Sequence, residues 1–207
     1  MTILYLIRHG QNEYVAKGKL AGRLPGVHLD EVGRRQAAAL AEQLKGVRFQ
    51  AIYASPLERT METAAPLAAM QGKKVHPLEG LLEIDYGKWQ GASLKLLHHR
   101  KLWAVIQHQP SLVQFPEGES FPQAQARVVA TLETIRRRHH SKKARVACVF
   151  HSDPIKLAIA HYLGLPHDLF HRLTIEPASV SVFAIGDAFT RLLMLNDSRA
   201  TRAGGAG

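Results

Sequence analysis

Two histidines in this sequence follow short apolar runs. His9 comes after the run 2–7, and His151 comes after the run 145–150. A continuous apolar run is typical of a strand that is buried on both faces of a parallel sheet. Ligands bind beyond the carboxyl ends of such strands. Because small or polar residues flank both histidines, we expect them to share one site, where a neutral imidazole can act as a nucleophile.

Further motifs surround these histidines, in a fixed order from about residue 3 to residue 195. They are 6–12 (LIRHGQN), 20–23 (LAGR), 29–37 (LDEVGRRQA), 55–64 (SPLERTMETA), 82–91 (LEIDYGKWQG), 118–120 (GES) and 150–153 (FHSD). Together they resemble the signature segments of the histidine phosphatase superfamily, the phosphoglycerate-mutase-like enzymes, and most closely its phosphatase branch. The resemblance implies an α/β fold, a three-layer αβα sandwich with a mainly parallel central sheet.

The residue types in these motifs suit phosphoryl transfer. Negative charge spreads over three phosphate oxygens in the reaction, so fixed cations and donors are needed. Arg8 and Arg59 can grip those oxygens with planar forks, and His151 can donate to them. His9 can attack phosphorus and carry it as a phosphohistidine, while Glu83 can protonate the leaving oxygen and then deprotonate water. These groups supply the positive field themselves, so we expect neither a metal ion nor another cofactor.

The resemblance also implies a role for each matching position. The catalytic set is His9 as nucleophile, Glu83 as general acid and base, and Arg8, Arg59 and His151 as the phosphate pocket. The phosphate- and substrate-binding set is Arg8, Asn12, Ala21, Gly22, Arg23, Arg59, His151 and Ser152.

Four positions leave alternatives open. Mutase-type members carry an asparagine seven residues beyond the motif arginine, where this chain has Val15, which weakens a mutase interpretation. Ser152 stands where glycine is common. Asp85 lies two residues from Glu83 and is a rival acid, and Glu119 either touches the site or pairs with Arg127.

Strands alternating with helices predict one α/β domain over residues 1–197. The tail 198–207 is predicted to be disordered. We expect strands over 2–7, 51–54, 75–77, 145–150, 180–185 and 191–195, the last two forming a hairpin. We expect helices over 31–45, 55–71, 93–107, 123–138 and 154–164, capped in three cases by Asp30, Ser55 and Asp153. The intervening segments 11–29, 79–91 and 110–122 are interpreted as loops.

Composition narrows the class of protein without choosing the substrate. The chain of 207 residues has 27 Lys plus Arg against 17 Asp plus Glu, a formal net charge of +10, which favours anionic partners. The single cysteine, Cys148, cannot form an internal disulfide, and no apolar run is long enough for a signal sequence or membrane span. We therefore expect a cytoplasmic protein without a membrane partner.

We interpret the cationic run and the two histidine pairs as surface residues rather than as binding sites. The cationic run 136–145 is typical of a solvated helix end, so we do not expect a nucleic-acid partner. The adjacent pairs His98–His99 and His139–His140 lack the spacing of zinc ligands.

The leading hypothesis is a metal-independent phosphatase of small phosphorylated metabolites. The alternatives are a phosphoglycerate mutase or phosphotransferase and, from another class, a non-catalytic basic scaffold or nucleic-acid-binding protein. The oligomeric state stays open.

Overall fold

The centre of the fold is a pair of strands that are apolar along most of their length. In the computed structural model, which describes residues 1–141 and 144–199, β1 and β4 pair in parallel, with Arg8 opposite Phe150. The sheet order is β3-β2-β4-β1-β5-β6; the first four strands pair in parallel, and β5 runs antiparallel to both of its neighbours, β1 and β6. The strands are β1 (Thr2–Arg8), β2 (Ala51–Ala54), β3 (Val75–Pro77), β4 (Ala144–Phe150), β5 (Val180–Ile185) and β6 (Thr190–Asp197).

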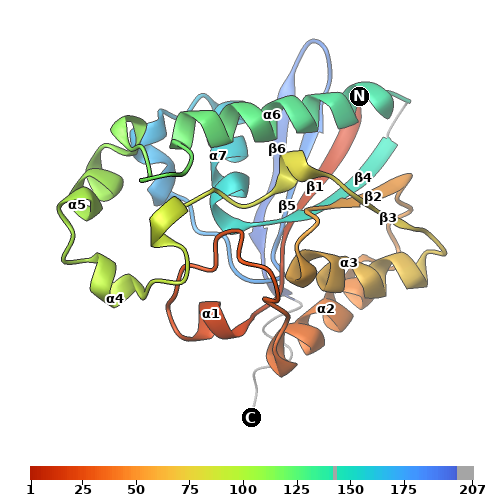
Figure 1. The fold of residues 1–207 in the computed structure, drawn as a ribbon. Helices are drawn as coiled ribbons and strands as arrows, with labels where there is room; N and C mark the ends of the chain where they lie inside the picture. The colour runs from red at the N-terminus through yellow and green to blue at the C-terminus, as the bar shows by residue number, and fades with distance from the viewer. Residues whose placement is uncertain (142–143, 200–207) are drawn as a thin grey trace.

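Helices cover both faces of this sheet (Figure 1). On one face α2 (Glu31–Leu44) and α3 (Glu58–Met70) pack together and bury Leu40 and Leu67 against Ile52 of the sheet. On the other face α6 (Phe121–Arg138) and α7 (Ser152–Leu163) bury their apolar stripes against β1 and β4. The predicted α/β fold with a mainly parallel sheet between two helical layers is therefore confirmed.

A third apolar cluster lies beside the sheet and is built largely by residues 84–121. The helix expected over 93–107 is interrupted, because His98, His99 and Arg100 are exposed polar residues that form a turn instead. The loops expected over 11–29, 79–91 and 110–122 each contain a short helix as well. The short elements are α1 (Glu13–Ala16), η1 (Glu79–Leu81), η2 (Gly87–Trp89), α4 (Leu94–Leu97), α5 (Lys101–His108), η3 (Pro110–Leu112) and η4 (His167–Arg172).

The first residues of α2, α3 and α7 show whether the predicted helix N-caps are present. The Asp30 side chain accepts a hydrogen bond from the Gly33 N–H at 2.8 Å, so the predicted cap of α2 is confirmed. The other two expected caps are wrong. The helix α3 begins at Glu58 after Leu57, with no side-chain cap, and Ser55 is buried elsewhere. Asp153 lies within the first turn of α7, after His151.

Two further residues from the sequence analysis are Arg136, in the cationic run 136–145, and Cys148. Arg136 pairs with Glu133 at 2.8 Å and with Asp187 at 2.9 Å. Cys148 is fully buried in β4. Within residues 1–141 and 144–199, no helix is long and apolar enough to cross a membrane, and no group of three or more potential ligand side chains could hold a metal ion.

The predicted disordered tail falls almost wholly outside the described residues, which end at Arg199. Arg199 pairs with Asp197 at 2.7 Å.

Candidate active site

The two strand-end histidines lie next to each other. Because Arg8 and Phe150 are partners in the parallel ladder, the next residues, His9 and His151, leave the sheet side by side, and their ring centroids are 5.3 Å apart. The His9 N–H extends the ladder by donating to the Phe150 carbonyl at 3.0 Å. Both side chains are buried at the carboxyl ends of β1 and β4. The prediction that the two histidines lie together is thus confirmed.

The His9 ring is held in one tautomer. Its Nδ1 lies 2.7 Å from the Gly10 carbonyl oxygen, which can only accept, so Nδ1 carries the proton and Nε2 keeps a free lone pair. Burial, reinforced by the positive charges of Arg59 and Arg8, holds the pKa of His9 well below its usual value. A neutral imidazole with a free Nε2 is the form that a nucleophile requires.

Close backbone contact fixes the loop that carries His9. The first turn of α2 lies against this loop at Gly33, where an added Cβ would be 2.0 Å from the Gln11 carbonyl oxygen. At Gly10 a Cβ would be 2.8 Å from the Gly33 oxygen. Glycine at both positions therefore lets the strand end and the helix approach each other, which immobilises the histidine loop.

Several buried nitrogens beside His9 have no hydrogen-bond partner within the described part of the chain. They are Arg8 Nε, Asn12 Nδ2, Arg59 Nε and Arg59 Nη1. Arg59 is 1% exposed and comes from the first turn of α3, where its Nη2 donates to the Gly22 carbonyl at 2.7 Å. Buried donors without partners are costly, so this cluster is suited to bind an oxyanion.

The second histidine, His151, is fully buried beside the cavity and contacts two of its lining residues through Nδ1. That atom lies 3.4 Å from Arg59 Nη2 and 4.0 Å from Glu83 Oε2. On its other side, His151 Nε2 is 2.9 Å from Ser55 Oγ. Ser55 ends β2, the third neighbouring strand, and sequence reasoning misplaced it as a helix cap. The strand-end rule that found the two histidines could also have found Ser55.

Glu83 has the environment of a carboxylic acid that stays protonated near neutral pH. Its side chain is nearly buried, and Oε1 accepts from the Ile84 N–H at 2.9 Å. Burial, together with the negative charge of Asp153, raises the pKa of Glu83 to about 7. The rival acid Asp85 is not among the described residues that line the cavity, and its Oδ1 accepts from the Gly87 N–H.

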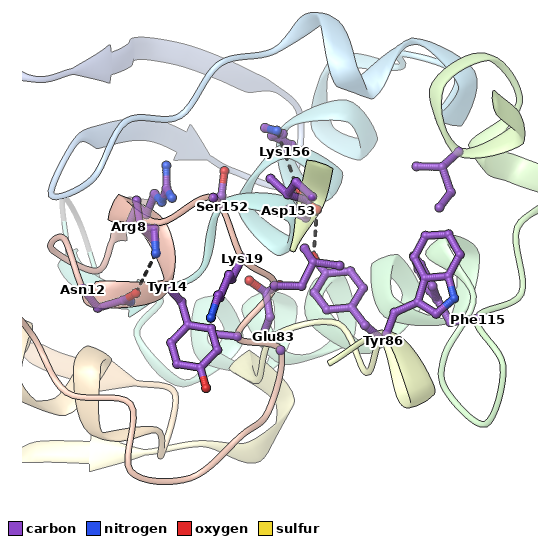
Figure 2. A pocket seen from close by; sticks show the side chains of 18 of the residues that line it. Arg8, Asn12, Tyr14, Lys19, Glu83, Tyr86, Phe115, Ser152, Asp153 and Lys156 are labelled. Atoms are coloured by element: carbon purple, nitrogen blue, oxygen red, sulfur yellow. Dashed lines mark hydrogen bonds and ion pairs between the residues drawn. The ribbon is translucent and has the colours of Figure 1, made fainter. Parts of the chain in front are cut away.

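A cavity of about 370 Å³ opens over these groups. Of the sequence-predicted rim, the structure brings Asn12, Ala21, Gly22 and Ser152 into the lining, together with Arg8, His9, Arg59 and Glu83. Figure 2 shows how Arg8, Asn12, Glu83 and Ser152 lie around this space. The prediction for Asn12 was incomplete, because its Oδ1 also caps α1 by accepting from the Val15 N–H at 2.9 Å.

Two residues of the predicted binding set, Arg23 and His151, are not among the described residues that line the cavity. His151 lies beside it, whereas Arg23 points elsewhere. Its Nε donates to the Glu83 carbonyl at 2.8 Å, and its Nη2 pairs with Glu119 at 2.9 Å. Glu119 also pairs with Arg127 at 2.8 Å, so the ion-pair interpretation of Glu119 is the one confirmed. These contacts lie behind the Glu83 backbone rather than at the substrate side.

A buried polar cluster beside Glu83 was also missed. The Tyr86 hydroxyl donates to Asp153 Oδ2 at 2.9 Å, and Lys156 Nζ donates to Asp153 Oδ1 at 3.2 Å (Figure 2). All three side chains line the cavity. Their spacing in the sequence carries no common motif, so only the fold brings them together.

Comparison with protein families decides the relationship. The family model described as histidine phosphatase superfamily (branch 1) matches residues 4–198. The chain belongs to this superfamily. His9 and His151 thus lie in a histidine phosphatase fold, as the sequence motifs implied.

Relatives within the superfamily include both phosphatases and mutases. Phosphoserine phosphatase 1 of Hydrogenobacter thermophilus is 31% identical over 95% of this chain and 92% of its own length. The 2,3-bisphosphoglycerate-dependent phosphoglycerate mutase of Thermoplasma acidophilum is also 31% identical, over 89% of this chain and 88% of its own.

Solved structures of superfamily members share this architecture. YhfR of Bacillus stearothermophilus superposes with a TM-score of 0.90 at 25% identity, over 97% of this chain and 100% of its own. Phosphoserine phosphatase of Entamoeba histolytica, in complex with 3-phosphoglyceric acid, has a TM-score of 0.86 at 27% identity, over 97% and 100% of the two chains. Small phosphorylated metabolites are thus ligands of a related structure.

Proposed function

We propose that this histidine phosphatase hydrolyses phosphomonoesters of small metabolites through a phosphohistidine formed on His9. The observation that supports this function best is the free Nε2 of a neutral His9 beside unpartnered donors of Arg8, Asn12 and Arg59. Those donors hold the phosphate oxygens, so phosphorus is presented to the imidazole lone pair.

The first step makes the phosphoenzyme. His9 Nε2 attacks phosphorus, a P–N bond forms, and the bond from phosphorus to the ester oxygen breaks. Glu83 gives its proton to that oxygen, and the alcohol leaves. The raised pKa of Glu83, about 7, keeps a proton available for this transfer near neutral pH.

The second step returns the enzyme to its starting state. A water molecule attacks phosphorus, and the Glu83 carboxylate takes one of its protons. The P–N bond breaks, inorganic phosphate leaves, and Glu83 is again protonated. In both steps Arg8 and Arg59 neutralise charge on the phosphate oxygens, and His151 lies beside them.

Val15 supports hydrolysis rather than phosphoryl transfer back to a second metabolite. Val15 lines the cavity at the position where mutase-type members carry an asparagine that contacts phosphate. An apolar side chain there cannot donate a hydrogen bond to a phosphate oxygen.

The decisive experiment traps the intermediate. The purified chain is mixed with ³²P-labelled phosphomonoester and quenched in alkali, with and without a chelator. We expect an acid-labile label on the wild type and on the control His99→Ala, which alters an exposed histidine, but none on His9→Ala. Label on His9→Ala, or activity that needs added metal, would refute the mechanism. Transfer of the label to phosphoglycerate instead of water would identify a mutase.

A further inference from the structure

The cavity has two ends of different chemistry. Arg8, His9 and Arg59 line one end, which is the phosphate end, and the buried His151 lies beside them. Away from it the lining becomes apolar, and its side chains come from α1 and its following loop and from the segment 89–121. They are Val15, Leu20, Trp89, Leu94, Trp103, Ile106, Phe115 and Phe121. We call these eight side chains the apolar wall.

Within the apolar wall, Phe115 packs edge-on against two other members of the wall and against Tyr86. Phe115 is 2% exposed, and its ring centroid lies 5.8 Å from that of Trp89, 5.4 Å from that of Phe121 and 5.0 Å from that of Tyr86. These edge-on contacts fix the rings relative to one another. The wall is therefore a preformed surface, and a ligand does not have to order it.

The charged side chains of Lys156 and Asp153, which line the cavity near the apolar wall, form an ion pair with each other. Lys156 Nζ lies 3.2 Å from Asp153, whose other oxygen accepts from Tyr86. Burial lowers the pKa of His171, so that its imidazole is neutral near pH 7. Lys19 also lines the cavity, but its side chain is exposed, so water and salt screen its charge. Among the described residues that line the apolar part of the cavity, a carboxylate on the leaving group would thus meet no buried cation that is free to bind it.

We propose that the apolar wall selects phosphomonoesters whose leaving group carries a flat, apolar ring. This inference rests on the proposed function and specifies its substrate class. A cavity of about 370 Å³ is larger than a phosphorylated three-carbon acid needs and lies in the usual range for larger ligands, roughly 300–1,000 Å³. An apolar ring would remove its own surface and that of the wall from water. A serine or glycerate chain would leave the apolar wall in contact with water. The chain therefore differs in substrate class from the phosphoserine phosphatases that it resembles.

The test compares substrates with alcohols of similar intrinsic reactivity. These are 2-phenylethyl phosphate and n-propyl phosphate, with O-phospho-L-serine as the charged competitor. We expect kcat/KM for 2-phenylethyl phosphate to exceed that for either of the others by about tenfold or more. Equal values, or a preference for O-phospho-L-serine, would overturn the inference while leaving the phosphatase function intact.

A second measurement does not depend on turnover. Affinities of 2-phenylethylphosphonate and n-propylphosphonate, which cannot be hydrolysed at carbon, are measured by calorimetry. The aryl compound is expected to bind about tenfold more tightly. If both phosphonates bind equally, the inference fails; if the aryl compound binds tightly but no ester is hydrolysed, the proposed function fails instead.

Variants locate the preference on the wall. Trp103→Ala is expected to lower kcat/KM for 2-phenylethyl phosphate about tenfold and to change that for n-propyl phosphate by less than about threefold, with Trp103→Phe intermediate. The matched control is Leu96→Ala, an apolar residue of the neighbouring α4 that is 68% exposed and lies outside the wall. A uniform loss on both substrates in Trp103→Ala would show that Trp103 only supports the fold.

Discussion

His151 Nε2 lies 2.9 Å from the hydroxyl oxygen of Ser55, a residue 96 positions earlier in the chain. Both residues follow directly on paired strands, β4 and β2, so the sheet itself brings them together. Arg59 Nη2 can only donate, so its 3.4 Å contact makes Nδ1 of His151 the acceptor. The ring proton is then on Nε2, which donates to Ser55 Oγ. Ser55 therefore acts as a positioning residue that holds the His151 ring against Arg59.

Ser55→Ala should lower kcat about fivefold, because the His151 ring loses the hydrogen bond that fixes its orientation and tautomer, a loss of about 1 kcal/mol. The measurement is kcat together with the ¹⁵N chemical shifts of the His151 ring. A purely structural role for Ser55 would lower the melting temperature without changing the ring's tautomer. Unchanged ¹⁵N shifts would contradict the positioning role.

Glu83→Gln should slow hydrolysis by roughly 10²–10⁴-fold, since amide cannot give or take the proton. Asp85→Asn is the matched control, because that carboxylate is directed to the Gly87 N–H and to Arg23. It should change kcat by less than about threefold. Steady-state kinetics on one ester suffices, and the reverse pattern would identify Asp85 as the acid.

The pH profile follows from the protonation state of Glu83. Phosphorylation needs the protonated carboxyl, whose pKa is raised to about 7 by burial and by Asp153. The value of kcat/KM should therefore fall about tenfold per pH unit above that point. Asp153→Asn removes one negative charge and should move this alkaline limb to lower pH.

The control for that shift is Asp187→Asn, whose carboxylate is exposed and pairs with Arg136 away from the cavity. Its pH profile should match the wild type. An Asp153→Asn profile that coincides with the wild type would mean that Asp153 does not act on Glu83.

Gly33→Ala should destabilise the fold by about 1–3 kcal/mol, because its Cβ would lie 2.0 Å from the Gln11 carbonyl oxygen. In a chain of this size that loss lowers the melting temperature by about 2–12 °C. Gly46→Ala is the control, since nothing lies within 4 Å of its Cβ. Thermal unfolding of the two variants is followed by circular dichroism. Equal melting temperatures would show that the loop at Gln11 can shift without loss of stability.

Local sequence signals predicted the strands and the histidine pair well, because each signal lies within a few residues. The apolar run before His9 and the Asp30 cap are examples. The failures come from partners that are distant in the chain. Ser55 and Asp153 have the residue types of helix caps, yet their side chains bind His151 and Tyr86 across the fold.

The site's outer parts escaped prediction for a related reason. Arg23 sits in a matching motif, but its guanidinium pairs with Glu119 rather than facing the cavity. The apolar wall draws on short helices that are too brief for a periodic pattern, such as α4 and α5. Their positions are set by the third apolar cluster, which sequence reasoning could not assemble.

The position of β1 has a consequence for how the enzyme forms. This strand leads directly into His9 and precedes the other strands of the sheet in the sequence, yet its two neighbours in the sheet are residues 144–150 and 180–185. Such non-local pairings form slowly during folding. A chain interrupted before residue 144 would hold His9 and Arg59 without β4 or His151. The candidate site is therefore complete only when the whole sheet has formed.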